Sequence, residues 1–94
     1  MRYNESVQLL QLNGKAGVSI VKFRYERVKK VILTIVREAG ILSYEELASR
    51  SAGRLSHIDG NNNWYMEEVV TDLEARGQLK CSLNNGQLFI KSVN

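Results

Sequence analysis

Residues 63–76, NWYMEEVVTDLEAR, and residues 78–93, QLKCSLNNGQLFIKSV, decide the fold, because together they predict a helix that runs directly into a β-hairpin. Asn63 is a residue type that caps free helix amides, and Gly77 stands where a glycine commonly ends a helix. The apolar residues between them recur at helical spacing and form one stripe: Met66, Val69, Val70 and Leu73.

The hairpin is predicted by its turn. Asn85-Gly86 is the favoured pair for a two-residue type I′ turn, which requires positive φ at both positions. With these residues at the tip, the following pairs lie opposite one another: Asn84 with Gln87, Leu83 with Leu88, Ser82 with Phe89, Cys81 with Ile90, and Lys80 with Lys91. Apolar pairs then share one face, as a half-buried ribbon requires.

Two further helices and a short strand precede this unit. A first helix is predicted from about Arg24 to Glu38, ending at Gly40, and no convincing N-cap marks its start. Its buried stripe consists of Val28, Val31, Ile32, Ile35 and Val36. Ile41-Leu42 is short enough to be a single strand that pairs with the hairpin. Residues 43–46, Ser-Tyr-Glu-Glu, form a capping box that begins a second helix running to about Ser56.

The N-terminal segment predicts an additional hairpin. Residues 6–12 and 18–22 flank the turn-like residues 13–17, Asn-Gly-Lys-Ala-Gly, and place Val7, Leu9, Val18 and Ile20 on one face. We therefore expect an α+β fold, a winged helix-turn-helix with three helices, a C-terminal β-hairpin wing and an extra N-terminal β-hairpin. Residues 1–23 would form this arm, packed on a winged-helix domain over residues 24–94.

Composition is that of a small globular domain. The 94 residues suffice for one domain, and the single cysteine, Cys81, cannot form an internal disulfide. No apolar run is long enough for a membrane span or resembles a signal peptide, so we expect a cytoplasmic protein. The net charge of +3 is unevenly distributed: residues 1–42 carry eight cations and three carboxylates, whereas residues 43–94 carry five and seven.

Four stretches of the sequence form a recognisable combination: residues 7–10 with the Asn-Gly-Lys-Ala-Gly arm, Tyr25-Glu26, Trp64-Tyr65, and residues 72–77, Asp-Leu-Glu-Ala-Arg-Gly. In these stretches the chain resembles an uncharacterised family of small bacterial winged helix-turn-helix proteins. The resemblance implies the fold and little about activity. Relatives tend to carry a basic or neutral residue where this chain has Glu67-Glu68, and this difference weakens an expectation of DNA binding.

The charge of the third helix disfavours the usual mode of DNA recognition. Its face opposite the apolar stripe carries Glu67 and Glu68 and no Lys or Arg, whereas phosphates dominate affinity for DNA. We expect a small regulatory protein that contacts nucleic acid, with DNA as the candidate partner, through the wing and the first helix instead. The candidate residues are Lys80, Phe89 and Lys91 in the wing and Lys15, Lys22, Arg24, Arg27, Lys30 and Arg37 in the arm and first helix. The alternative for the helix cations is the solvated side of an amphipathic helix.

The second hypothesis is a winged helix that binds a protein, either another protein or a second copy as a homodimer, and no DNA. The surface would be the acidic side of the third helix: Trp64, Glu67, Glu68, Thr71 and Asp72. Trp64 has two interpretations, an exposed contact residue or a core residue covered by the arm or by the turn before the third helix, and we favour the second.

Catalysis and metal binding are not indicated. The single histidine, His57, has one nearby carboxylate, Asp59, and Cys81 lies far along the chain, so no recognisable metal-ligand spacing exists. Residues 13–17 lack the Gly-Lys-Ser/Thr of a P-loop. We therefore expect no enzyme, no cofactor, no metal and no membrane partner.

Overall fold

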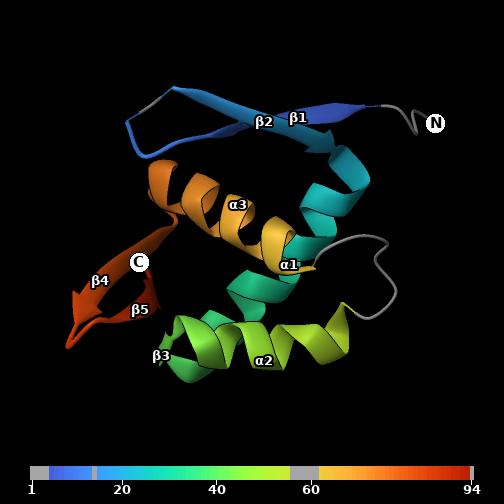
Figure 1. The fold of residues 1–94 in the computed structure, drawn as a ribbon. Coiled ribbons are helices and arrows are strands. Elements are labelled where there is room, and N and C mark those ends of the chain that lie inside the picture. Colours follow the sequence, from blue (N-terminus) through green and yellow to red (C-terminus); the bar gives the residue numbers. More distant parts are fainter. Residues whose placement is uncertain (1–4, 14, 56–61, 94) are drawn as a thin grey trace.

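The computed structural model describes residues 5–13, 15–55 and 62–93, and these form three helices and two antiparallel sheets in a mixed α+β fold (Figure 1). The elements follow in the order β1 (Ser6–Leu10), β2 (Ala16–Val21), α1 (Lys22–Ala39), β3 (Ile41–Ser43), α2 (Tyr44–Arg54), α3 (Asn62–Ala75), β4 (Leu79–Asn84) and β5 (Gln87–Ser92). This confirms the order of elements predicted from the sequence.

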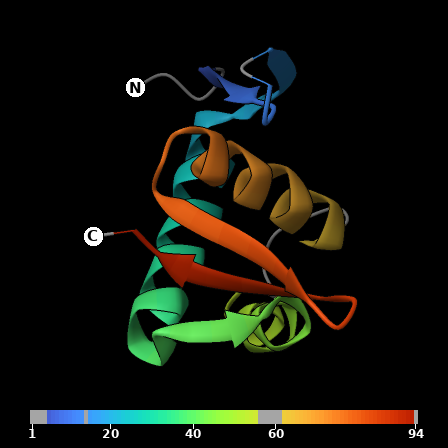
Figure 2. The same ribbon diagram turned by 90° about the vertical axis from the view of Figure 1, so that its left-hand side faces the viewer.

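A single apolar core lies where the three helices meet the three-stranded sheet β3-β5-β4 (Figure 2). Each helix contributes fully buried side chains, among them Ile32 from α1, Leu47 from α2 and Leu73 from α3. Ile90 of the central strand β5 is equally buried. Burial of each such side chain stabilises the fold by about 1.5–3 kcal/mol, so this core dominates the folding free energy.

The arm formed by β1 and β2 covers one end of α1 and α3 (Figure 1). Leu9 and Ile20 are buried there as predicted, whereas Val18 is 36% exposed. The pairing register shifts between Gln8 and Leu10, and this irregularity breaks the regular alternation that the prediction assumed.

Helix α1 begins directly where β2 ends, two residues before the predicted start. The backbone amide of Lys22 donates to the carbonyl of Glu5 over 2.8 Å, so the arm ladder continues into the first helical residue. No side chain caps this end. At the other end Gly40 has φ +81°, the left-handed conformation that glycine adopts readily, and its amide bonds to the carbonyl of Val36.

The C-terminal hairpin has the predicted turn and all five predicted residue pairs. Asn85 and Gly86 have φ +55° and +78°, as a type I′ turn requires. The short strand β3 pairs with β5, so that β5 is the central strand of the sheet. Residues 41–42 were predicted to pair with this hairpin; the structure confirms it and extends the pairing to Ser43.

The ends of α2 and α3 depart slightly from the prediction. The Ser43 hydroxyl accepts from the amide of Glu46 over 3.1 Å, which confirms the predicted cap of α2, but α2 ends at Arg54 rather than near Ser56. Asn63 is the second residue of α3 rather than its N-cap. At the C-terminal end of α3, Gly77 has φ +80° and the amide of Gln78 bonds to the carbonyl of Leu73, a Schellman motif.

Candidate functional site

The solvent-facing side of the three-stranded sheet carries both wing lysines. The side chains that alternate with the buried Leu42 and Ile90 point away from the helices. We call this surface the outer sheet face, and it consists of Ile41, Ser43, Lys80, Ser82, Phe89 and Lys91. Ile41, Ser43 and Ser82 were not anticipated as site residues. The predicted pairing of 41–42 together with strand alternation was sufficient to find Ile41, and the hairpin register was sufficient to find Ser82. Ser43 was predicted only as the cap of the second helix.

The outer sheet face is positive and partly apolar. Lys80 lies directly opposite Lys91 and both are exposed, while Phe89 is half-buried and Ile41 is 56% exposed. Like charges at directly opposed positions destabilise a sheet by a fraction of a kcal/mol, on the order of 0.2–1 kcal/mol. None of the six residues is acidic, so an anion bound here would relieve this repulsion.

A second positive surface is an open groove of about 810 Å³ along the solvent side of α1. We call it the α1 groove. Its wall contains four cations (Lys22, Arg27, Lys30 and Arg54), two carboxylates (Glu5 and Glu26) and two apolar side chains (Phe23 and Val31), together with Thr34. Phe23 was missed because the predicted start of the helix excluded it, and Arg54 was missed because it comes from α2.

Ion pairs neutralise only part of the α1 groove. Lys22 lies 3.8 Å from Glu5, and Arg54 lies 3.6 Å from Glu38. Within the described part of the chain, Arg27 and Lys30 have no ion-pair partner. The groove therefore keeps a positive excess.

The remaining predicted cations join neither surface. Arg24 donates to the hydroxyl of Tyr65 over 2.7 Å, and its guanidinium lies 5.7 Å from the centre of that ring, so it ties α1 to α3. Lys15 is exposed beside the arm turn, and Arg37 is exposed in the last turn of α1, where a cation suits the helix dipole. The structure thus distributes the predicted nucleic-acid residues over separate places.

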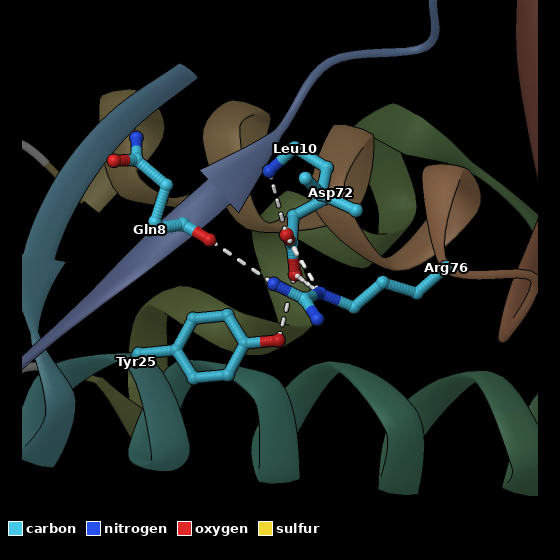
Figure 3. A network of polar contacts seen from close by, with 5 residues as sticks. All are labelled: Gln8, Leu10, Tyr25, Asp72 and Arg76. Atoms are coloured by element: carbon cyan, nitrogen blue, oxygen red, sulfur yellow. Dashed lines mark hydrogen bonds and ion pairs between the residues drawn. The ribbon is translucent and has the colours of Figure 1, made fainter. Parts of the chain in front are cut away.

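Asp72 is completely buried, which contradicts its predicted place on an interaction surface. Figure 3 shows its carboxylate between three elements. One carboxylate oxygen, Oδ1, accepts from the backbone amide of Leu10 over 2.8 Å, and Oδ2 accepts from the hydroxyl of Tyr25 over 2.6 Å. Arg76 Nε donates to both oxygens at 2.9 Å, and its Nη2 donates to the carbonyl of Gln8 over 3.1 Å (Figure 3).

This network fastens β1 to α1 and α3, so the Asp72 carboxylate is a structural group. Burial and then the hydrogen bond to Asp72 raise the pKa of Tyr25 well above its usual value, and the hydrogen bond with Asp72 raises the pKa of Arg76. Both donors therefore stay protonated. The sequence offered no signal for the burial of Asp72, because its position on the helix lies beside the polar face and its contacts with Leu10 of the arm and Tyr25 of α1 come from distant parts of the chain.

The uncovered side of α3 retains the other predicted interaction residues, and we call it the acidic face of α3: Trp64, Glu67, Glu68 and Thr71. Trp64 is 39% exposed and makes an edge contact with the Tyr65 ring at 5.0 Å, so the favoured interpretation of Trp64 as core is wrong. Glu67 is exposed, and Glu68 and Thr71 are half-buried. This face is negative, in contrast to the two basic surfaces.

A smaller pocket of about 350 Å³ lies between α3 and the hairpin, lined by Tyr44, Glu67, Val70, Thr71 and Leu88. Among the described residues the buried hydroxyl of Tyr44 finds no hydrogen-bond partner. Burial, and then the charge of Glu67, raise the pKa of Tyr44 to about 12. The sequence had indicated Tyr44 only as part of the capping box at residues 43–46.

Two features are absent from the part of the chain that the structure describes. No group of three or more His, Cys, Asp or Glu side chains there is arranged to hold a metal ion, and no helix there is long and apolar enough to cross a membrane. His57 and Asp59 lie outside the described residues. Cys81 packs against the core, and burial raises the pKa of its thiol to about 12.

Comparison with known proteins shows the family. Residues 6–88 match the model of a family described as "Family of unknown function (DUF6958)", and the chain belongs to this family. The matched segment includes the arm β1-β2, all three helices, β3, β4 and the first two residues of β5. No curated protein and no solved structure matches the chain.

Proposed function

We propose that this protein is a winged helix that binds nucleic acid through the outer sheet face, with the hairpin β4-β5 as its wing. The observation that carries the proposal is the uncovered pair Lys80 and Lys91 beside the half-buried Phe89. Lysines contact phosphates, and an aromatic ring on a sheet can stack with a base. The acidic face of α3 repels phosphates, so α3 would not serve as the reading helix. The cations of α1 would add long-range attraction rather than direct contacts.

The acidic face of α3 is a different surface of the molecule. Nucleic-acid binding by the sheet neither requires nor excludes a protein contact there. With only two lysines at its centre, the outer sheet face fits contacts to the sugar-phosphate backbone rather than the reading of a base sequence.

The test is a titration of labelled single-stranded and duplex oligonucleotides of generic sequence across a salt series, followed by fluorescence anisotropy. The variant Lys80→Gln/Lys91→Gln should weaken binding to every sequence. It should also reduce the slope of the logarithm of the binding constant against the logarithm of the salt concentration by about 1 for each lysine removed. The control Lys15→Gln/Arg50→Gln removes the same charge from the arm and α2. Equal loss in both variants, or no binding by the wild type at low salt, would refute the proposal.

A further inference from the structure

The α1 groove and the acidic face of α3 have complementary charges. The groove wall contains four cations against two carboxylates, and its Arg27 and Lys30 are without ion-pair partners among the described residues. The acidic face presents Glu67 and Glu68 without any cation, and neither carboxylate forms an ion pair within the described residues. Each face therefore supplies the charge that the other lacks.

Each of these two faces also carries an aromatic side chain. Phe23 is 74% exposed at the N-terminal end of the α1 groove, where Val31 adds a half-buried apolar surface. Trp64 is 39% exposed at the N-terminal end of α3. Tryptophan is among the commonest residues to dominate the energy of a protein interface, and a second aromatic ring is a favourable partner for it.

The spacing of these groups along the two helices matches. In α1, Arg27 follows Phe23 by four residues, and in α3 Glu67 and Glu68 follow Trp64 by three and four. One helical turn rises by about 5.4 Å, so Arg27 in α1 and both glutamates in α3 lie roughly one turn beyond the aromatic ring of their helix, while Lys30, seven residues after Phe23, lies roughly two turns beyond it. Laid parallel, the helices would bring ring against ring and cation against carboxylate, whereas an antiparallel arrangement would not.

We propose that the chain associates with itself, the acidic face of α3 of one copy docking in the α1 groove of the next. Trp64 then packs on Phe23 and Val31, and Glu67 and Glu68 lie opposite Arg27, with Lys30 one turn further along α1. A nucleic acid fits this groove less well, because Glu5 and Glu26 in its wall repel phosphates. An occupant that is partly apolar and carries few negative charges suits the groove better.

The positions of the two faces dictate the form of the assembly. α1 and α3 pack against each other, and each of the two faces lies on the side of its helix that is turned away from the core. Figure 2 shows the two helices on opposite sides of the molecule. An interface between unlike surfaces on opposite sides is heterologous, and it produces open chains or rings rather than a two-fold dimer.

The experiment is sedimentation velocity over a concentration series extending to millimolar protein, at low and high salt and without nucleic acid. The wild type should grow beyond a dimer with concentration at low salt and return to the monomer at high salt. Trp64 is the only tryptophan in the sequence, so its fluorescence emission should shift to shorter wavelength as the assembly forms. A wild type that stays monomeric at every concentration overturns the proposal.

Two variants locate the interface. Arg27→Gln/Lys30→Gln alters only the groove, and Glu67→Gln/Glu68→Gln alters only the acidic face. Each should weaken association about tenfold, as expected for the loss of two exposed ion pairs. An equimolar mixture of the two retains one intact groove and one intact acidic face, and should therefore stop at a heterodimer.

The control variant Lys15→Gln/Arg50→Gln should assemble like the wild type, because both residues lie outside the α1 groove. The proposed interface is wrong if either interface variant assembles as strongly as the wild type. It is also wrong if the wild type assembles but the mixture forms no heterodimer, because the copies then meet through other surfaces. A two-fold dimer of the wild type that both variants also form would likewise overturn the proposed interface. Because the assay contains no nucleic acid, its outcome is independent of binding by the outer sheet face.

Discussion

Replacing Asp72 removes the acceptor that holds the arm to the helices, and the structure allows the effect to be calculated. In Asp72→Ala the amide of Leu10 and the hydroxyl of Tyr25 lose their partners in a closed site. Each buried group left unsatisfied costs about 1–3 kcal/mol. Arg76 adds little, because its side chain is 34% exposed and can be hydrated. We expect a loss of about 3–4 kcal/mol in the free energy of unfolding, a large part of the ~5–15 kcal/mol typical of a small domain.

Asp72→Asn separates the charge from the shape of the side chain. Asparagine retains one oxygen that can accept from Leu10, and the Tyr25 hydroxyl can rotate to accept from the new amide group. The bond to Arg76 loses its ionic character, so we expect a smaller loss of about 1–2 kcal/mol. Asp72→Asn also keeps the test valid if Asp72→Ala fails to fold.

Urea denaturation followed by circular dichroism measures both losses, with Glu67→Gln as the control because it removes an exposed carboxylate from the same helix. Hydrogen exchange of the Leu10 amide should accelerate in both Asp72 variants more than exchange in the core strands, because the arm is released first. The reasoning is refuted if Asp72→Ala is no less stable than the control, or if Leu10 remains protected.

Three further predictions concern single residues. Ser43→Ala should reduce the free energy of unfolding by about 1 kcal/mol in urea denaturation, since it removes the cap of α2, and an unchanged midpoint would contradict this role. Gly86→Ala should lower the free energy of unfolding by about 1 kcal/mol, because residue 86 has a positive φ. The control Gln87→Ala, which changes the neighbouring residue outside the turn, should lower it by less in the same assay. Burial raises the pKa of the Cys81 thiol from 9.0 to about 12, so the folded state keeps this proton to a higher pH than the unfolded chain. The contribution of this thiol to the free energy of unfolding should therefore be complete below pH 9 and decrease as the pH rises from 9 toward about 12. In Cys81→Ala the free energy of unfolding should not change between pH 9 and 10.0, the usual pKa of tyrosine. The same decrease with pH in the variant as in the wild type would disprove the assignment.

The elements that local chemistry specifies could be predicted from the sequence. Asn85-Gly86 has few alternatives to a type I′ turn, and that turn fixes the register of every pair from Lys80 with Lys91 onward. Ser43 and Gly77 mark helix ends by hydrogen bonds and backbone angles that involve only neighbouring residues.

The candidate surfaces could be predicted only in part. The opposed Lys80 and Lys91 follow from the hairpin register, and Glu67 and Glu68 follow from helical spacing. The start of α1 could not be found, because no capping residue marks it, and Phe23 was missed for this reason. The α1 groove also requires Arg54 from a different helix, and no pattern within α1 indicates that neighbour.

The sequence by itself determined the order of the elements, the hairpin turn and its register, and the opposite charges of the two halves, because each depends on residues close together in the chain. The tertiary structure alone decided that Asp72 is buried rather than exposed, that Arg24 contacts Tyr65, and that Trp64 remains 39% exposed. The physical reason is the docking of the arm. It brings Leu10 within 2.8 Å of Asp72 across 62 residues of sequence, and such a contact depends on how complete elements pack together.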